Sequence, residues 1–226
     1  MGKLTDWEKV TPEPLGKGGQ STVFLVRSPK RRAAREKSFK TLKDLSGQGF
    51  NDETALKFAS ASLDVARGEY ASELGALKMF DPRAAGPEAE QQALGRMQNE
   101  IAILKQNRPG LLKLLDSNES ERWIVTEYCR QGTLERHLQE YRGNAGLALK
   151  SLLPLVQTAG ELHKVPVVHR DIKPQNIFIG EQGELLLGDF GIVFLPNQAE
   201  RLSFTGESVG PRDFMPPWVL LDDHPK

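Results

Sequence analysis

The sequence contains a single cysteine, Cys129, which excludes an intramolecular disulfide and suits a reducing compartment. It lacks any uninterrupted apolar run of about 18 residues, so no segment is expected to span a membrane. The N-terminus MGKLTDWEKV has no apolar core of a secretory signal. Thirty basic and thirty acidic residues cancel, so overall charge gives no reason to expect nucleic acid as a partner. These absences favour a cytoplasmic protein.

The remaining composition is that of an ordinary soluble protein. Hydrophobic residues make up 38% and charged residues 27% of a 226-residue chain, enough for one large domain or two small lobes sharing a cleft. The basic run PKRRAAREKSFK (29–40) departs locally, with six Lys/Arg and one Glu. Such a run most often forms a solvated loop or helix face. The alternative is a surface for an acidic partner or a lipid headgroup.

Turn and periodicity signals organise the first half of the chain. Residues 11–29 place a Gly-rich turn between two short apolar runs, which predicts a hairpin. Apolar residues at helical spacing predict a helix over 51–67, and EYASELGALKMF (69–80) predicts a strand. Residues 87–107 begin with a proline and early acids and continue with a helical apolar stripe, which predicts a long helix.

The second half opens with strands and then becomes helical. Two adjacent strands are expected at LLKLLD and RWIVTEYC, followed by two helices and two β-rich segments, the second turning at GEQGE. These elements are expected at 111–116 and 122–129 (strands), 133–141 and 147–164 (helices), and 165–170 and 176–190 (β-rich segments).

HRDIKPQN (169–176) and DFG (189–191) carry the clearest chemical signal. Their carboxylates, Asp171 and Asp189, flank a hairpin-like segment. Either motif alone could be a charged loop or a turn, but the two in this order and spacing leave little room for that interpretation. Together they resemble the catalytic loop and metal-binding motif of a protein kinase, and the KPQN ending resembles the Ser/Thr type.

The resemblance implies a role for each polar residue of these motifs. Transfer of a γ-phosphoryl group needs a carboxylate to orient the attacking hydroxyl and oxygen ligands to hold Mg²⁺. By family position, Asp171 is the catalytic base and Lys173 neutralises γ-phosphate charge. Asn176 and Asp189 are the expected metal ligands. ATP and Mg²⁺ are therefore the expected cofactors.

The Gly-rich stretch LGKGGQSTVF (15–24) is weak evidence by itself, because a lone GxGxxG pattern is common. Gly16 and Gly18 match the pattern, and Ser21 stands where the third glycine would be. Backbone N–H groups of such a turn can approach phosphate oxygens closely because no Cβ intervenes. The strand–turn–strand context favours a kinase over a dinucleotide fold.

Two lysines compete for the strand position that contacts the ATP phosphates in a kinase, because the tripeptide Ala-Leu-Lys occurs twice. Lys57 could pair with Glu73, and Lys78 with Glu100. Only Glu100 is followed by a turn, a strand and a hinge-like segment in the family's order. We therefore expect Lys78 and Glu100 to form the catalytic pair, which makes residues 28–68 an insertion.

VTEYCRQGTL (125–134) resembles the kinase hinge. Thr126 is the candidate gatekeeper, and Glu127 and Cys129 would offer backbone groups to adenine. The structural alternative is a plain strand-to-helix connection. The residues expected by family position to sandwich the adenine are Leu15, Val23, Ala76 and Phe178.

The resemblance implies an α+β, two-lobed protein-kinase-like fold. We expect a β-rich N-lobe with one long helix at 1–128, carrying the 28–68 insertion, and a partial helical C-lobe at 129–226. The expected function is transfer of the ATP γ-phosphate to Ser or Thr hydroxyls of proteins. The alternatives are a nucleotide-binding regulator without efficient turnover and a small-molecule kinase. The sequence does not reveal the role of the insertion.

Departures from the family pattern lie near the end of the sequence. Pro211 and Trp218 replace a threonine and a glutamate of the family. Few residues follow, so the C-lobe is expected to be incomplete. Apolar residues of the 147–164 helix should then stay partly in water and promote self-association. The residues expected to remain exposed are Leu152, Leu153, Val156 and Leu162.

The segment LSFTGESVG (202–210) offers three hydroxyls for regulation: Ser203, Thr205 and Ser208. A phosphate there would add about −1.5 to −2 charge and could pair with Arg170, ordering the segment. The alternative is an exposed loop whose hydroxyls are only solvated.

Overall fold

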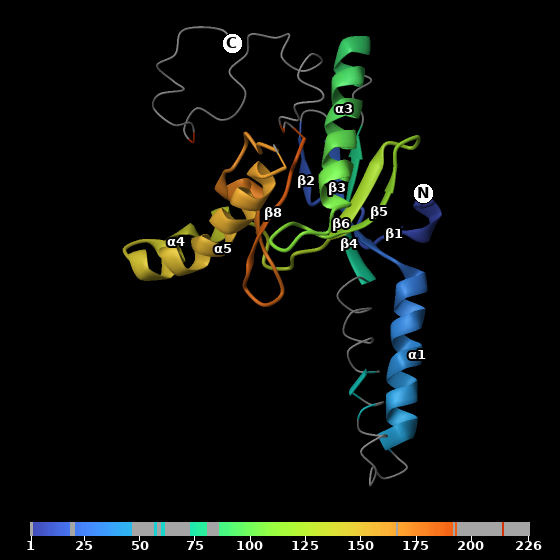
Figure 1. The fold of residues 1–226 in the computed structure, drawn as a ribbon. Helices are drawn as coiled ribbons and strands as arrows, with labels where there is room; N and C mark the ends of the chain where they lie inside the picture. The colour runs from blue at the N-terminus through green and yellow to red at the C-terminus, as the bar shows by residue number, and fades with distance from the viewer. Residues whose placement is uncertain are drawn as a thin grey trace, which may run out of the picture. The chain divides into compact units, whose positions relative to one another are not determined.

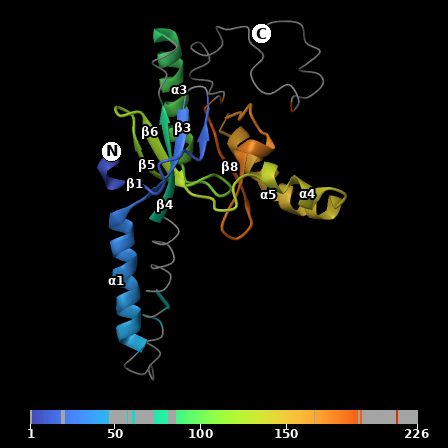
Figure 2. The same ribbon diagram turned by 180° about the vertical axis from the view of Figure 1, so that it is seen from behind.

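A computed structural model describes residues 2–18, 21–46, 57, 60–61, 73–80, 86–165, 167–191, 193 and 214. The chain divides into two compact units, and each unit is built from two separate stretches of the sequence. The helices and strands are shown in Figures 1 and 2. Unit 1 is Met1–Asp81 with Leu115–Tyr128, and unit 2 is Pro82–Leu114 with Cys129–Lys226. The long helix at 87–104 therefore groups with unit 2.

Unit 1 is built on a sheet of six strands in the order β1-β3-β4-β6-β5, with β2 also pairing β3. Its central strands are rich in β-branched and other apolar residues, which pack well on a pleated surface. The sheet closes over a small core of Trp7, Val26, Leu77, Trp123 and Val125. The strands are β1 Glu8–Lys9, β2 Gly16–Lys17, β3 Ser21–Arg27, β4 Leu74–Phe80, β5 Leu114–Asn118 and β6 Trp123–Glu127, after a short 3₁₀ turn, η1 Leu4–Asp6.

The predicted Gly-rich hairpin is confirmed. β2 pairs antiparallel with β3, with Gly16 opposite Val23. The turn is closed by Leu15 N donating to Val23 O at 2.8 Å and by Gly18 N donating to Ser21 O at 2.8 Å. β3 then pairs antiparallel with β4 over its full length, from Ser21 opposite Phe80 to Arg27 opposite Leu74.

The basic run forms a helix, α1 Pro29–Ser46, and not a loop. Ser28 begins it, because its hydroxyl oxygen accepts from Arg31 N at 3.4 Å. Pro29 fits the first helical position, which needs no amide donor. Within unit 1, α1 leaves the end of β3 and runs away from the sheet (Figures 1 and 2). The predicted 51–67 helix lies almost wholly outside the described residues; those described there, 57, 60 and 61, are helical.

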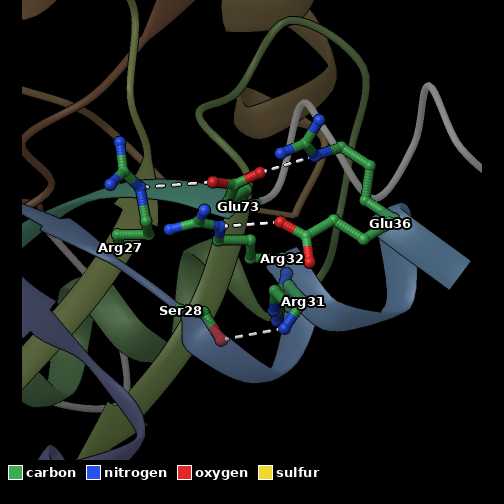
Figure 3. Close-up of polar contacts among 7 residues, drawn as sticks. Arg27, Ser28, Arg31, Arg32, Glu36 and Glu73 are labelled. Carbon is green, nitrogen blue, oxygen red and sulfur yellow. Dashed lines mark hydrogen bonds and ion pairs between the residues drawn. The ribbon is translucent and has the colours of Figure 1, made fainter.

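A buried carboxylate fastens the two ends of the insertion (Figure 3). Glu73, 5% exposed, directly precedes β4, and its backbone carbonyl accepts from Ser28 N at 2.9 Å. Arg35 Nε on α1 donates to Glu73 Oε2 at 2.7 Å. Arg27 Nε at the end of β3 lies 3.2 Å from Glu73 Oε1, an ion pair without hydrogen-bond geometry. One carboxylate thus joins β3, α1 and β4.

Unit 2 contains the remaining helices and a two-stranded β7-β8 sheet. Its larger core gathers buried side chains from α3, α5 and both strands, including Ile103, Leu155, Leu162 and Phe190. The predicted long helices are confirmed at α3 and α5; Asn144 caps α5 by accepting from Leu147 N at 3.1 Å. The elements are α3 Pro87–Leu104, η3 Leu134–His137, α4 Leu138–Tyr141, α5 Ala145–His163, η4 Pro174–Asn176, β7 Ile177–Ile179 and β8 Leu185–Leu187.

Strand β8 is held on both sides within unit 2. Ile177 pairs with Leu187 across the β7-β8 hairpin. On the other edge, Leu187 N donates to Gly110 O at 2.8 Å and Leu112 N donates to Leu187 O at 2.9 Å. For this reason the strand predicted at 111–116 begins only at Leu114: its first residues bond to β8 instead.

The β-rich segment predicted at 165–170 is not a strand. Among its described residues only Val168 makes a single bridge. Pro166 has no backbone N–H to offer a ladder, and the chain immediately turns into the catalytic loop.

The exposed apolar stripe predicted on α5 is correct only in part. Leu153 is 58% exposed and Val156 64% exposed, but Leu162 is 1% exposed in the core and Leu152 packs partly against it. Leu149, 72% exposed, extends the stripe. The expected self-association through this stripe stays a prediction. In the described part of the chain, no helix combines the length and hydropathy needed to cross a bilayer.

The Glu73 contacts predict a selective loss of stability. Glu73→Ala leaves two arginines without their carboxylate, and one partner removed from a buried pair is strongly destabilising. Because both arginines are partly exposed, we expect a loss of about 1–3 kcal/mol in the free energy of unfolding. The matched control is Glu36→Ala, which removes an exposed ion pair with Arg32 and should change stability little. Equal effects of the two variants in urea unfolding would contradict the role of Glu73.

Candidate active site

The carboxylate of Asp171 lies at the centre of a bonded group in unit 2. Its Oδ2 lies 2.9 Å from Lys173 Nζ and accepts from Asn176 Nδ2 at 2.8 Å. The same Asn176 amide donates to the Asp171 backbone carbonyl at 2.9 Å. Three residues expected from the sequence to act together are therefore in direct contact. Asn176 belongs to η4, the short turn that follows Pro174, and so returns toward Asp171.

The second oxygen of the same carboxylate is left open. Asp171 is 8% exposed, and its buried Oδ1 has no hydrogen-bond partner among the residues that the structure describes. A buried carboxylate oxygen without a donor is costly, and such groups concentrate at functional sites. Lys173 and Asn176 hold the carboxylate in place through Oδ2, which also fixes the direction of Oδ1.

The ring of His169 connects the catalytic loop with the segment before Asp189. Its Nε2 lies 3.0 Å from Gly188 O, and its Nδ1 accepts from Asp171 N at 3.3 Å. A carbonyl can only accept and a backbone N–H can only donate, so these partners select the neutral ring with the proton on Nε2. Burial lowers the pKa of His169 from 6.5, against smaller opposing effects of Gly188 O and nearby carboxylates.

Tight packing fixes the Gly188–Phe190 segment. Phe190 is fully buried, with its ring centroid 4.7 Å from that of His169. A Cβ on Gly188 would lie 2.8 Å from the Phe178 ring, so no larger residue fits without a shift. Gly188 N donates to Asn176 O at 3.0 Å.

Two non-glycine residues next to these motifs have left-handed backbone conformations. Arg170 has φ 63° and Asp189 φ 59°. Each such conformation costs of order 1 kcal/mol or more, and it persists where the surroundings impose it. Arg170 directly follows His169 and Asp189 directly follows Gly188, so both conformations stand beside the His169 hydrogen bonds.

The residues present fit a magnesium ion. The Asn176 amide nitrogen is used by Asp171, which leaves the amide oxygen as its available ligand atom. Asp189 adds a carboxylate, and Mg²⁺ prefers such hard oxygen ligands. Within the described ranges no three His, Cys, Asp or Glu side chains gather to hold a metal by themselves. This matches the usual magnesium site, in which one or two protein ligands are completed by phosphate and water.

Unit 1 carries most of the residues assigned to the nucleotide. In the antiparallel ladder Val23 on β3 lies opposite both Gly16 and Lys78. On the other side of β4, Lys78 lies opposite Ile124 and Ala76 opposite Thr126 on β6. Lys78 therefore sits in the middle of the sheet, whereas Lys57 is an exposed residue of the insertion.

The other residues assigned to the site lie on separate elements of the two units. Glu127 is the last residue of β6 and pairs with Gly75, while Leu15 is 43% exposed beside the glycine turn. In unit 2, Phe178 lies on β7, and Cys129 is half-buried against the core. Glu100 is 4% exposed on α3. Its pairing with Lys78, which belongs to unit 1, stays a prediction.

Two features of the site were not predicted from the sequence, and some predicted residues are not described by the structure. Gly188 was not expected to matter; its only signal was a glycine ending an apolar run directly before Asp189. The Asn176–Asp171 hydrogen bond was also not foreseen. Five residues singled out near the end of the sequence lie outside the described residues: Ser203, Thr205, Ser208, Pro211 and Trp218.

Comparison with known proteins decides the family. A family model described as "Protein kinase domain" matches residues 60–226, most of the chain. The chain belongs to the protein kinase family. The match confirms the resemblance carried by HRDIKPQN and DFG, and with it the α+β fold of a kinase whose β-rich part is unit 1. The region matched by the family model begins within the insertion, so the Gly-rich hairpin lies before the matched region.

Individual relatives carry serine/threonine kinase names. The kinase domain is 33% identical over 177 residues to "Serine/threonine-protein kinase 1" of Arabidopsis thaliana, covering 74% of this chain and 20% of that protein. It is 33% identical over 151 residues to "Serine/threonine-protein kinase PknL" of Mycobacterium tuberculosis, covering 65% and 37%. Mouse "Serine/threonine-protein kinase PAK 1" is 34% identical over 113 residues, covering 48% and 21%. The chain thus spans well under half the length of these relatives.

The neutral His169 predicts a pH-dependent contribution to stability. Its folded pKa lies below the unfolded value of 6.5, so as pH falls through 6.5 the unfolded chain takes up the proton first and the folded state loses stability. His169→Phe keeps a ring beside Phe190 but cannot titrate or donate to Gly188 O. Urea unfolding should show the variant less stable at pH 7.5, with the gap to wild type narrowing toward pH 5. The titration of the other histidines contributes equally to the stability of both proteins and therefore cancels in the difference between them. A gap independent of pH would contradict the neutral, buried ring.

Proposed function

We propose that this kinase domain transfers the γ-phosphate of ATP, with Mg²⁺, to Ser or Thr hydroxyls of protein substrates. The observation that carries the proposal is the Asp171 carboxylate, with one oxygen fixed by Lys173 and Asn176 and the other buried without a partner. The names of the relatives support the Ser/Thr preference, as does the Lys173–Asn176 sequence KPQN. A single half-buried free cysteine is compatible with the cytoplasm.

In this mechanism the protein contributes mainly orientation and charge. Asp171 Oδ1 accepts the hydrogen bond of the attacking hydroxyl and thereby aligns its oxygen with the phosphorus. Lys173, held by Asp171, adds positive charge as negative charge spreads over the transferred group. Mg²⁺, when bound through Asn176 and Asp189, supplies positive charge to the phosphate oxygens. His169 stays neutral and acts through position alone.

Unit 1 supplies the proposed phosphate-binding surface. The Gly16–Gly18 turn would let phosphate oxygens approach the backbone closely because no Cβ intervenes, and Lys78 would contact the α- and β-phosphates. Space at the turn supports this role. A Cβ on Gly16 would meet no atom within 4 Å, so the fold itself does not require glycine there. A close-approaching ligand gives a reason for it.

A nucleotide-binding regulator without turnover is the second candidate. Pro211 and Trp218 depart from the family pattern in the segment that usually docks the protein substrate. Such changes would affect substrate docking before nucleotide binding. The two candidates differ in one measurable respect, transfer of phosphate to an acceptor protein.

Lysine exchange tests the assignment of the phosphate contact. Lys78→Met should reduce transfer of radiolabelled phosphate from ATP to a generic protein acceptor by about 100-fold or more, because a charge contact to the transferring group is lost. Lys57 is an exposed lysine of the insertion, so Lys57→Met should leave phosphate transfer nearly unchanged. The reverse pattern would overturn the assignment. No transfer by the wild type, with ATP binding retained, would favour the regulator.

Glycine replacement separates a ligand contact from a folding role. Gly16→Ala meets no atom and needs no left-handed backbone, so the melting temperature should not fall. ATP affinity should weaken several-fold because the added methyl keeps phosphate oxygens from the turn. Gly75→Ala is the contrasting variant: its Cβ would collide with Val125 and stand 3.2 Å from the Trp7 ring, so it should lower the melting temperature. Unchanged ATP affinity in Gly16→Ala would remove the turn from the nucleotide site.

A further inference from the structure

Helix α1 concentrates positive charge in a chain that has none overall. Pro29–Ser46 contains seven Lys/Arg and two Asp/Glu, whereas the whole chain has thirty of each sign. The proposed phosphotransfer uses none of these residues. The helix is fixed to unit 1 at its first turns, and the rest of it runs away from the sheet (Figures 1 and 2). Its outer surface therefore belongs to the described surface of unit 1.

The three arginines of α1 are already engaged within unit 1. Arg31 donates from Nη2 to Leu115 O at 3.1 Å, and its guanidinium lies 5.5 Å from the centre of the Trp7 ring. Arg35 pairs with the buried Glu73. Arg32 donates from Nε to Glu36 Oε1 at 2.9 Å, a contact visible in Figure 3. Arg31 and Arg35 attach the helix to the rest of unit 1, and Arg32 is paired with the Glu36 carboxylate, so the three leave little charge for a partner.

Three lysines of the same helix are free. Lys30, Lys37 and Lys40 are exposed, and in the described part of the chain their ammonium groups make no hydrogen bond, ion pair or ring contact. Their spacing of seven and three residues places them within about 80° of one another around the helix axis. They extend over about 15 Å along it. We call these three residues the lysine stripe.

The surroundings of the lysine stripe argue against a membrane. An interfacial helix buries an apolar face in the bilayer. The face of α1 opposite the stripe is occupied by the Arg31 and Arg35 contacts to the sheet and cannot insert. Among the side chains of α1 that the structure describes, the large apolar one that is exposed is Phe39, at 46%, and its ring centre lies 6.0 Å from the Arg35 guanidinium, on the face away from the lysine stripe.

The surroundings also argue against a nucleic acid. Phosphate recognition favours arginine, whose planar fork binds two oxygens at once. Every arginine of α1 is engaged inside unit 1 or with Glu36, as described above. The chain as a whole is electrically neutral, whereas nucleic-acid-binding domains carry a basic surface extending well beyond three lysines.

We propose that the lysine stripe binds an acidic segment of a partner protein. Flexible point charges in a row suit carboxylates spaced along an extended chain, and they require no fixed geometry. Binding through exposed charges is screened by salt, since the Debye length is about 10 Å at 0.1 M. The interaction is therefore modest, salt-dependent and independent of the phosphotransfer proposed above.

The test measures binding directly. A fluorescein-labelled octaglutamate peptide is titrated with the 226-residue chain, and anisotropy is followed at 50 and at 300 mM NaCl. Wild type should bind at low salt and weaken clearly at high salt. Lys37→Glu/Lys40→Glu should weaken low-salt binding at least tenfold, because attraction becomes repulsion. The matched control Lys105→Glu/Lys150→Glu makes the same charge change at exposed, unpaired lysines of unit 2 and should weaken binding less than twofold.

Three further measurements separate the proposed binding from a loss of folding, from the proposed phosphotransfer and from binding to other polyanions. Circular dichroism and the melting temperature should match wild type in both double variants, since in the described part of the chain the replaced ammonium groups make no hydrogen bond, ion pair or ring contact. Asp171→Asn should bind the peptide as wild type does, so a failed phosphotransfer assay would leave this result unaffected. Equal loss in the two double variants, or no binding by wild type, would overturn the proposal. Tighter binding to phosphatidylserine vesicles or to a 20-nucleotide RNA than to the peptide would overturn it as well.

Discussion

The hydrogen bond between His169 and the Gly188 carbonyl is the contact on which the active-site half of unit 2 depends. It joins two segments that are nearly twenty residues apart, and each carries residues assigned to chemistry. The hydrogen bond that Nδ1 accepts from the Asp171 N–H requires a neutral ring, and burial favours that state by lowering the histidine pKa. The same ring receives the Asp171 amide and packs on Phe190. One uncharged imidazole thus bonds to the backbone at Asp171 and at the residue before Asp189.

A second set of bonds extends this order toward α3. Leu187, one residue before Gly188, is bonded by the β7 partner on one edge and by Gly110 and Leu112 on the other. Gly110 has φ 78°, and a Cβ there would collide with Thr158 on α5. The turn after α3 is therefore fixed to α5 and to β8 at once.

Much of the fold was predictable because its signals are local. The Gly-rich hairpin, α3 and α5 follow from turn residues and helical periodicity, and the structure has all three. Three expectations failed where a tertiary partner decided the outcome. Leu111 and Leu112 pair with β8, the Pro166 segment forms no strand, and Leu162 is buried by the core of unit 2. Whether the basic run would form a loop or a helix was left open, because its pattern is charged rather than apolar and the helix is held by arginine contacts.

The site divides in the same way. The motif predicted the identity of Asp171, Lys173 and Asn176, and the structure brings these three into contact. Motif spacing could not reveal the open oxygen of Asp171, the tautomer of His169 or the steric demand at Gly188. Each of these depends on which atoms surround the residue, and that follows only from the packed fold.

The way the insertion is attached to the sheet bears on how the sequence between β3 and β4 can change during evolution. The segment leaves after Arg27 and returns before Leu74, and these residues stand directly opposite each other in an antiparallel ladder. Such partners are about 5 Å apart, a gap that a two-residue turn can close. Register is set by the ladder itself, and the entropy of closing a loop grows only slowly with its length. The position between β3 and β4 can therefore gain, lose or exchange a whole module while the strand carrying Lys78 keeps its alignment.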